Sequence, residues 1–471
     1  MQVVATAGHK GHGKSSLVHA LTETTATAAG ASGASGAAEA AWTALPSGRR
    51  IAFVDPPGDE QAVAAVLAGI GPASAVIMVV AADEGWMPRS AEHLAAIDAL
   101  GVGAGLLVMT RADLADPTLA LRQARTALGR TCLAGAESVA VSTRTGEGVS
   151  QAVAALDRLA QRLPPPDPAG PVRLWVDGVS VPAGGARAGG VVVTGTLNAG
   201  TIRVDDELAC GSRTVRVRAA RTPVGEVAEV SGVTRVALTV TGAGATTALA
   251  PGTPLVAAGR WTETASVDVR HGFGAASGRL ARQLVLHMGS AAVPVRLRPL
   301  GPDTARLTLN TRLPLHVGDR ALLRDPRRRA VAGVSVLDVR PPPLARRGAA
   351  GERARELAQW PDHPGGEQLL RRHGVLRSAD LEVMGCTAPA DALRVGAGWV
   401  ADPGHWEALR RRLVNELDRH AAAHPATPGI SLEAARLRLG LPERSLVVRL
   451  VRPPLRLYGG RVYGAPPGQR G

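Results

Sequence analysis

Apolar positions in the first third of the chain fall into short continuous runs rather than alternating with polar ones. The runs cover residues 3–7, 51–54, 75–80 and 104–109, and stretches with helical patterning lie between them. A strand buried on both faces needs no polar side, so such runs between helices predict a parallel sheet covered on both faces. We expect an α/β domain over residues 1–165, ended by a stiff proline-rich linker.

The pattern changes after residue 170. Short runs rich in Val and Thr, such as 190–196 and 202–204, alternate with turns that contain Gly, Asn, Asp or Pro. Many short strands separated by turn residues are typical of antiparallel β-barrels. We place one barrel at residues 171–260 and a second at residues 261–340.

A third pattern follows the three prolines at 341–343. Apolar residues at helical spacing are clearest between Trp406 and Leu417, and two short apolar segments near the end flank Gly459 and Gly460. Helices followed by a hairpin with a glycine turn predict a winged-helix region at residues 345–471, made of two modules. Residues 26–41 contain only Ala, Gly, Ser, Thr and one Glu, and are expected to be mobile.

The sequence at residues 8–15 matches G-x-x-x-x-G-K-[ST]. The match follows a predicted strand and precedes a helical stretch, which is the context that a phosphate-binding loop requires. Its glycines would let backbone N–H groups surround the β-phosphate, Lys14 would reach the β- and γ-phosphates, and Ser15 would bind Mg²⁺. The alternative is a glycine-rich turn that matches by chance, against which the flanking strand and helix argue.

Lysine usage supports this interpretation. The chain contains two lysines, Lys10 and Lys14, and every other strongly basic residue is arginine. A lysine kept in an arginine-rich chain indicates a site that needs a compact ammonium group. Lys14 occupies the motif position, whereas Lys10 is expected to be an ordinary exposed loop residue.

Polar residues follow the ends of the other predicted strands. Asp55 and Gly58 come after the strand at 51–54, where a magnesium-linked carboxylate and a γ-phosphate N–H donor would belong. Asp113 follows the strand at 104–109 and could accept hydrogen bonds from guanine, with Ser142 placed to support the base. Each signal alone could be a plain turn, but their common order at strand ends indicates a GTP-binding domain. The nucleotide-binding residues would then be Gly8, His9, Gly11, His12, Gly13, Lys14, Ser15, Asp55, Gly58, Thr110, Arg111, Asp113 and Ser142, with Ser15 and Asp55 at the metal.

The net charge and the cysteine content limit which partners and which cellular compartment the sequence suggests. The formal net charge is +14, which suggests RNA or the ribosome as a polyanionic partner, although an arginine-rich genome would give part of the same excess. Three widely spaced cysteines form neither a disulfide framework nor a zinc motif. The N-terminus lacks a signal peptide, and the longest apolar run is far shorter than the ~20 residues of a membrane span. We expect a cytoplasmic protein without a membrane contact.

The chain resembles the bacterial selenocysteine-specific elongation factors, the SelB family. Residues 5–15 resemble that family's opening A-T-A-G-H-x-D-H-G-K-T, and residues 83–94 resemble its D-x-G-x-M-x-Q-T-x-E-H-L stretch. Residues 174–177 and 189–200 resemble the start of its second domain, and residues 318–325 resemble its third. The resemblance covers residues 1–340 in matching order, and the helical tail is similar to winged helices only more weakly.

The resemblance implies a multidomain fold: an α/β P-loop GTPase domain, two antiparallel β-barrels and a helical winged-helix region. It implies GTP, GDP and Mg²⁺ as ligands, and selenocysteyl-tRNA, the ribosome and an mRNA hairpin as partners of a monomeric RNA-binding factor in protein biosynthesis. It also implies an aminoacyl pocket that contains Asp177 and Arg235.

Several positions depart from the family pattern. Gly11 stands where the family has Asp, Arg111 where it has the base-reading Lys, and Gly178 where it has an Arg of the aminoacyl pocket. Asp59 occupies the position of the catalytic His, and the switch segment before Trp42 lacks the family's R-G-x-T motif. Since a carboxylate beside the γ-phosphate would be repelled, we expect slow GTP hydrolysis.

Three functions therefore remain open. The first is a selenocysteyl-tRNA carrier that hydrolyses GTP. The second is a degenerate SelB-like protein that binds nucleotide and RNA with little GTPase activity, and the third is another GTPase of the elongation factor Tu superfamily. The sequence reaches only two apparent winged helices, where the family usually has four, so we expect weak or absent recognition of an mRNA hairpin.

Overall fold

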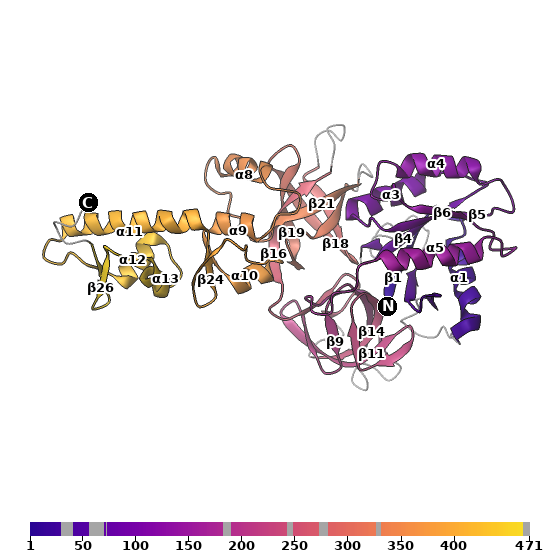
Figure 1. The fold of residues 1–471 in the computed structure, drawn as a ribbon, viewed down its shortest axis with the longest axis horizontal. Coiled ribbons are helices and arrows are strands. Elements are labelled where there is room, and N and C mark those ends of the chain that lie inside the picture. The colour runs from indigo at the N-terminus through magenta and orange to yellow at the C-terminus, as the bar shows by residue number, and fades with distance from the viewer. Residues whose placement is uncertain are drawn as a thin grey trace. The chain divides into compact units, whose positions relative to one another are not determined.

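The computed structural model describes residues 1–29, 41–55, 70–71, 73–181, 190–242, 248–272, 281–325 and 331–464. The chain divides into two compact units. The first comprises Met1–Leu315 and Asp319–Gln359, and the second comprises His316–Gly318 and Trp360–Gly471. Figure 1 shows the elements of both units along the chain.

The first unit begins with a six-stranded sheet in the order β2-β3-β1-β4-β5-β6. Its strands are β1 (Gln2–Gly8), β2 (Trp42–Ala44), β3 (Arg50–Val54), β4 (Ala75–Ala81), β5 (Gly105–Thr110) and β6 (Glu137–Ala140). All neighbouring strands run parallel except β2 and β3, which form an antiparallel pair. The four strands predicted from apolar runs, β1, β3, β4 and β5, are parallel as expected. The unpredicted strand β2 is antiparallel to β3, because Gly48 takes a left-handed backbone that lets the chain turn back directly.

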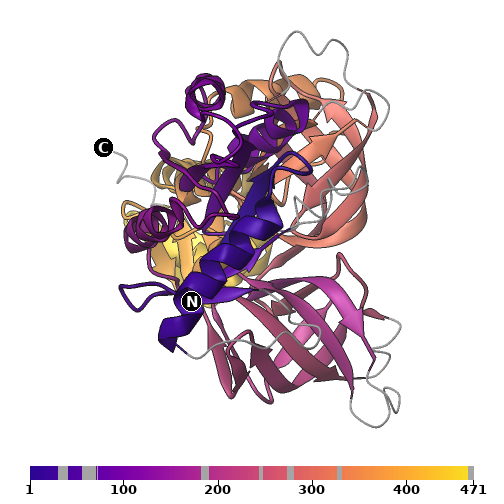
Figure 2. The ribbon, with the colours of Figure 1, turned by 90° about the vertical axis from the view of Figure 1, so that its right-hand side faces the viewer.

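Helices cover both faces of this sheet (Figure 2). They are α1 (Lys14–Ala29), α3 (Pro88–Leu100), α4 (Thr118–Leu128) and α5 (Val149–Arg162). Apolar residues of α1 and α5 form one buried cluster with the strand residues that point to one face of the sheet. Apolar residues of α3 and α4 form a second cluster with the strand residues that point to the opposite face. Helix α1 continues through residues 26–29, where the sequence predicted a mobile segment; alanine is the best helix former, so these residues extend the helix. The rest of that segment, 30–40, lies outside the described residues.

Two closed antiparallel barrels follow. The first contains β7 (Arg173–Ser180), β8 (Val191–Leu197), β10 (Glu207–Cys210), β11 (Arg213–Thr222), β14 (Thr234–Thr241) and β15 (Pro254–Ala257), with short pieces β9 (Thr201–Arg203), β12 (Gly225–Val227) and β13 (Glu229–Ser231) beside them. The second contains β16 (Thr262–His271), β17 (Gln283–Met288), β18 (Ala291–Pro299), β19 (Thr304–Leu315), β20 (Arg320–Arg324) and β21 (Val331–Asp338). The prediction of two barrels from short Val- and Thr-rich runs is confirmed.

Helix α8 (Ala349–Ala358) also belongs to the first unit, although it lies inside the range 345–471 assigned above to the helical tail. Its Arg353 is fully buried and pairs with Asp268 and Asp338 of the second barrel at 2.7 and 2.6 Å. Buried charges of opposite sign hold this helix on the barrel.

The second unit is helical with two small sheets. Its helices are α9 (Gly366–His373), α10 (Ser378–Val383), α11 (Pro403–Ala423), α12 (Leu432–Leu439) and α13 (Arg444–Leu450), and its strands are β22 (Val375–Arg377), β23 (Leu393–Gly396), β24 (Trp399–Ala401), β25 (Ile430–Ser431), β26 (Arg456–Tyr458) and β27 (Arg461–Tyr463). Helix α11 buries Trp406, Leu409, Leu413 and Leu417, the positions that the periodicity identified. Strands β26 and β27 pair around Gly459 and Gly460, which both have positive φ, so the predicted hairpin is confirmed.

Candidate nucleotide-binding site

The phosphate-binding loop connects β1 to α1 at the carboxyl edge of the sheet. Gly8, Gly11 and Gly13 all have positive φ, which side chains other than glycine rarely adopt. A Cβ atom on Gly8 would lie 2.2 Å from the carbonyl oxygen of Val79, so the loop can run this close to β4 only with glycine there. The positive φ values and the close approach to β4 explain why glycine occupies these positions.

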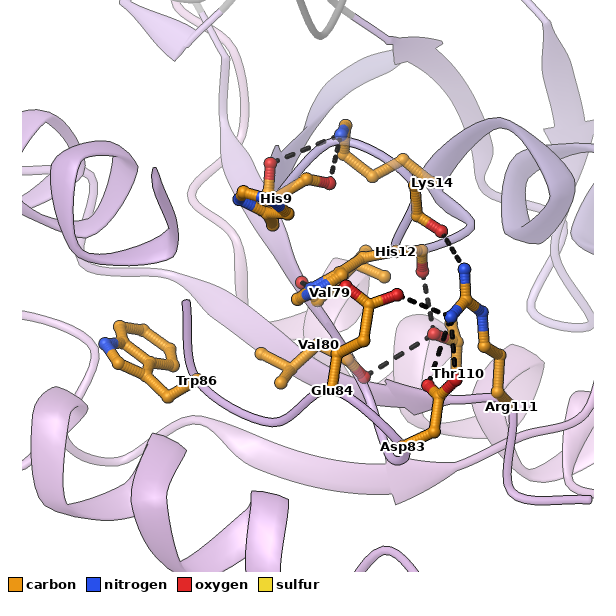
Figure 3. Close-up of polar contacts among 12 residues, drawn as sticks. His9, His12, Lys14, Val79, Val80, Asp83, Glu84, Trp86, Thr110 and Arg111 are labelled. Carbon is orange, nitrogen blue, oxygen red and sulfur yellow. Dashed lines mark hydrogen bonds and ion pairs between the residues drawn. The ribbon is translucent and has the colours of Figure 1, made fainter. Parts of the chain in front are cut away.

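Lys14 lies at the first turn of α1, with its side chain turned back over the loop (Figure 3). Its ammonium group donates to the carbonyl oxygens of Gly8 at 3.2 Å and His9 at 2.9 Å. Burial lowers the pKa of Lys14, while the nearby carboxylate of Asp55 opposes that shift. A partly desolvated ammonium that donates to carbonyl oxygens is well suited to an anionic ligand.

Ser15 and Asp55 meet at the same edge. The Ser15 hydroxyl donates to one carboxylate oxygen of Asp55 at 2.5 Å, and the hydroxyl of Thr6 donates to the other. Thr6 is a buried polar residue within the largely apolar strand β1. The hydroxyl and the carboxylate form an oxygen pair of the kind that Mg²⁺ prefers, so these residues fit the predicted metal.

Helix α3 supports the loop from the other side. The backbone N–H of Gly8 donates to Nδ1 of His93 at 3.0 Å. Burial, together with the positive charges of Lys14 and Arg89, lowers the pKa of His93 to about 4. The ring is therefore neutral at physiological pH, as an acceptor at Nδ1 must be.

Arg111 joins three loops of the site (Figure 3). It donates to Asp83 at 2.8 Å, to Glu84 at 2.6 Å and to the carbonyl oxygen of Gly11 at 2.5 Å. The hydrogen bond with Asp83 is the main cause that raises the pKa of Arg111. Its backbone has a φ of 57°, a left-handed conformation that is unusual for a residue with a long side chain. Such a conformation is typical of functional sites.

His12 is fully buried beneath this network. Its Nδ1 lies 3.4 Å from the carbonyl oxygen of Val79, and its Nε2 lies 3.6 Å from Glu84. Burial lowers the pKa of His12, which favours the neutral ring. The ring packs between the loop and β4. The hydroxyl of Thr110 donates to the carbonyl oxygen of His12 at 2.7 Å, which ties β5 to the same loop.

Asp113 and Ser142 come together at the ends of β5 and β6. Hydrogen bonds from Ser142 and then from Arg144 hold the pKa of Asp113 below its ordinary value. Arg144 donates to one carboxylate oxygen at 2.9 and 2.7 Å, but its side chain is 73% exposed. An exposed ion pair of this kind is weak. A nucleotide base with two N–H donors could therefore take the place of Arg144 as the hydrogen-bond donor to the ionised carboxylate of Asp113.

Two predicted site residues, Gly58 and Asp59, lie outside the described residues. The remaining predicted residues of the GTP site converge from the carboxyl ends of β1, β3, β5 and β6. No role was predicted for Thr6 or His93, whereas Arg144 belongs to the segment 142–146 that was expected to support the base. Thr6 could have been suspected as a polar residue in an apolar run, but the contact of His93 depends on the folded chain.

The two residues assigned by resemblance to an aminoacyl pocket lie apart from these loops, on the first barrel. Arg235 of β14 forms a two-point ion pair with Asp177 of β7, and the hydroxyl of Thr194 on the intervening β8 also donates to Asp177 at 2.9 Å. A Cβ atom on Gly178 would lie 2.5 Å from the Thr194 hydroxyl oxygen. The glycine therefore makes room for this hydrogen bond.

Comparison with known proteins shows what the chain is similar to. The elongation factor Tu GTP binding domain matches residues 28–162. A selenocysteine-specific elongation factor from Desulfomicrobium baculatum is 32% identical over 212 residues, which cover 44% of this chain and 33% of the relative. The selenocysteine-specific elongation factor of Escherichia coli (strain K12) is 29% identical over 371 residues, which cover 76% of this chain and 58% of the relative. These matches support the resemblance of the chain to the SelB family.

A solved structure adds support for the fold. The crystal structure of a bacterial selenocysteine-specific elongation factor, EF-Sec, superimposes with a TM-score of 0.80 and 21% identity, over 98% of this chain and 80% of that one. The predicted resemblance to the SelB family is thus supported, and the predicted α/β domain followed by two barrels is confirmed. The chain spans between 33% and 58% of the length of these two curated relatives. None of the helices in the described ranges is long and apolar enough to cross a membrane.

Proposed function

We propose that this SelB-like protein is a GTP-binding translation elongation factor that delivers selenocysteyl-tRNA to the ribosome. The observation that supports this most strongly is the convergence of Lys14, Ser15, Asp55 and Asp113 at one sheet edge, in a chain that continues into two barrels. A guanine nucleotide, with Mg²⁺ as its counterion, is the ligand that this set of groups suits.

Each residue of the site would have a defined task. Bound Mg²⁺ would neutralise part of the phosphate charge, with Ser15 as a direct ligand and Asp55 holding its coordination shell in place. Lys14 would exchange its two carbonyl acceptors for phosphate oxygens, and the N–H groups of the loop would point at the same anion. Asp113 would accept the two N–H groups on the Watson–Crick edge of guanine, while Arg111 fixes the loop that carries it.

The aminoacyl-tRNA would be the substrate of the first barrel. Asp177 and Arg235 would face the aminoacyl group, with Gly178 in place of a second arginine. The ribosome and tRNA would be polyanionic partners of a monomeric protein with net charge +14, and we propose the cytoplasm as its location.

One alternative rests on the sequence at the catalytic position. Asp59 replaces the expected His, and an ionised carboxylate there could neither donate a hydrogen bond to the attacking water nor avoid repulsion from the γ-phosphate. A protein that binds nucleotide and RNA but turns GTP over slowly would retain the site described above. Comparing single-turnover hydrolysis by the natural chain and by Asp59→His, with and without ribosomes, separates this alternative from an efficient GTPase.

The central test is protection of the aminoacyl ester. The intact protein is mixed with selenocysteyl-tRNA or seryl-tRNA, with GTP or GDP, and the rate of ester hydrolysis is measured. We expect GTP-dependent slowing for selenocysteyl-tRNA and little for seryl-tRNA. Equal rates under all four conditions, in protein that calorimetry shows to bind GTP, would exclude delivery of this substrate and favour the alternative.

A further inference from the structure

A basic recess lies on the outer face of the second barrel, formed by residues that take no part in the nucleotide site. Its volume is about 400 Å³. Three arginines and two hydroxyl residues from the strands line it, namely Ser266, Arg296, Arg298, Arg306 and Thr308. The chain that leaves the barrel supplies the remaining wall, at Leu344 and Ala345.

The strand register explains why these side chains gather. Ser266 of β16 lies opposite Thr308 of β19, which in turn lies opposite Arg296 of β18. A second row, two residues along each strand, consists of Asp268, Arg306 and Arg298. Side chains two residues apart on a strand project from the same face, so the two rows form one polar surface. The residues between them, such as Val267 and Leu307, fill the barrel interior.

The carboxylate in this surface, Asp268, already has two cationic partners. Asp268 is completely buried and pairs with both Arg306 and Arg353. Arg306 also donates to the carbonyl oxygen of Pro342 at 2.9 Å, so it joins the barrel to the departing chain. One carboxylate shared by two guanidinium groups leaves the surroundings of Arg306 short of negative charge.

Arg298 directly faces Arg306 across the strand pair, and like charges in this position destabilise a sheet. Within the ranges that the structure describes, neither Arg298 nor Arg296 makes an ion pair or side-chain hydrogen bond, and both are exposed. Their donors, and the hydroxyl groups of Ser266 and Thr308, converge on the recess. We propose that this recess is a binding site for a phosphate group.

Phosphate is the anion that this donor set fits best. Planar guanidinium groups bind phosphate oxygens in pairs, and hydroxyl groups can donate to a third oxygen. The phosphate could belong to a small molecule or to an RNA backbone, and the chemistry of recognition is the same for both. Because Arg306 holds Pro342 and the recess borders Leu344, a bound phosphate would also fasten this chain segment to the barrel.

The test uses the whole chain with its nucleotide site saturated with unlabelled GDP. Equilibrium dialysis measures labelled inorganic phosphate and pyrophosphate, and filter binding measures a duplex RNA over a salt series. The variant Arg296→Gln/Arg298→Gln is compared with Arg221→Gln/Arg394→Gln. The control pair is also exposed and removes the same net charge at positions outside the recess.

For a small-molecule phosphate, we expect the recess variant to bind phosphate or pyrophosphate at least ~10-fold more weakly, and the control to match the natural chain. For an RNA phosphate, we expect little binding of the free anions. The recess variant should then lose more RNA affinity than the control, and its salt slope should fall by up to about two. If the two variants behave alike in both assays while their melting temperatures match the natural chain, the proposal is wrong.

Discussion

At the scale of single residues, the choice between lysine and arginine follows from the acceptors that each side chain meets. Lys14 sits in a narrow loop where two carbonyl oxygens surround one nitrogen. Arg111 spans Asp83, Glu84 and the carbonyl oxygen of Gly11, which a single ammonium could not reach together. Arginine can therefore stand where the family has lysine, because Asp83 and Glu84 accept hydrogen bonds from its guanidinium group.

Lys14→Ala should weaken binding of GTP and GDP by at least ~10-fold. The substitution removes the ammonium group that would face the phosphates, and a charge-assisted hydrogen bond supplies about 1.4 kcal/mol or more. Isothermal titration calorimetry measures the change. Lys10→Ala is the matched control, because Lys10 belongs to the same loop but is exposed, and its affinity should stay within about twofold of the natural chain. Equal affinities in all three proteins would remove Lys14 from the phosphate site.

Asp113→Asn should change which base is bound. The carboxylate would accept two N–H groups of guanine, whereas an amide presents one acceptor and one donor. Xanthine has a carbonyl oxygen where guanine has its amino group, so the amide complements xanthine. We expect GTP affinity to fall by at least ~10-fold and xanthosine triphosphate affinity to rise, measured by competition with a fluorescent nucleotide. A variant that keeps its preference for GTP would show that Asp113 does not contact the base.

At the scale of elements, the local pattern of apolar residues identified the longer strands of the first domain but not the short ones. Continuous apolar runs located β1, β3, β4 and β5, because burial on both faces leaves a clear signal. The short strands β2 and β6 were not identified, since three or four residues carry little periodicity. Helix α11 was predicted well because its four buried positions repeat at helical spacing.

Residues of the candidate site could be proposed from sequence only where the chemistry of a ligand requires a residue type. Lys14, Ser15 and Asp113 were proposed because phosphates, Mg²⁺ and a guanine base need such groups. The contact of His93 with the loop could not be predicted, because His93 reaches the site from a helix whose position depends on the whole domain. A sequence names the groups that touch a ligand more readily than the groups that hold them.

Helix α3 also packs on the second barrel, and glycine at position 333 allows the approach. A Cβ atom on Gly333 would lie 2.8 to 3.0 Å from atoms of Ala99, including its backbone. Gly333→Ala should destabilise the first unit by about 1–3 kcal/mol, because backbone cannot move aside cheaply. Thermal unfolding followed by circular dichroism measures the effect. Gly135→Ala, where nothing lies within 4 Å of the added atom, should change stability by less than about 1 kcal/mol. Equal melting temperatures would show that α3 and β21 separate without cost.

At the scale of the whole molecule, the excess of arginine is only partly neutralised by neighbouring acids. Exposed pairs such as Arg371 with Glu367 and Arg436 with Glu433 compensate charge along single helices. The sequence nevertheless has 54 Lys and Arg against 40 Asp and Glu. Surface pairs of this type contribute little stability, so the excess is better explained by a polyanionic partner than by folding.

RNA binding by this chain should therefore depend steeply on salt and weakly on sequence. Each phosphate that an arginine neutralises adds about −0.7 to −0.9 to the slope of log K against log salt, so several contacts give a strong dependence. Filter binding of a hairpin RNA and of a scrambled RNA of equal length, over a series of salt concentrations, measures both properties. We expect steep and parallel lines for the two RNAs, with affinities that differ by less than about tenfold, because phosphate contacts carry no sequence information.

Tight hairpin binding that persists at high salt, with the scrambled RNA far weaker, would instead require base-specific contacts. The protein would then recognise an mRNA element directly, contrary to what its charge alone predicts.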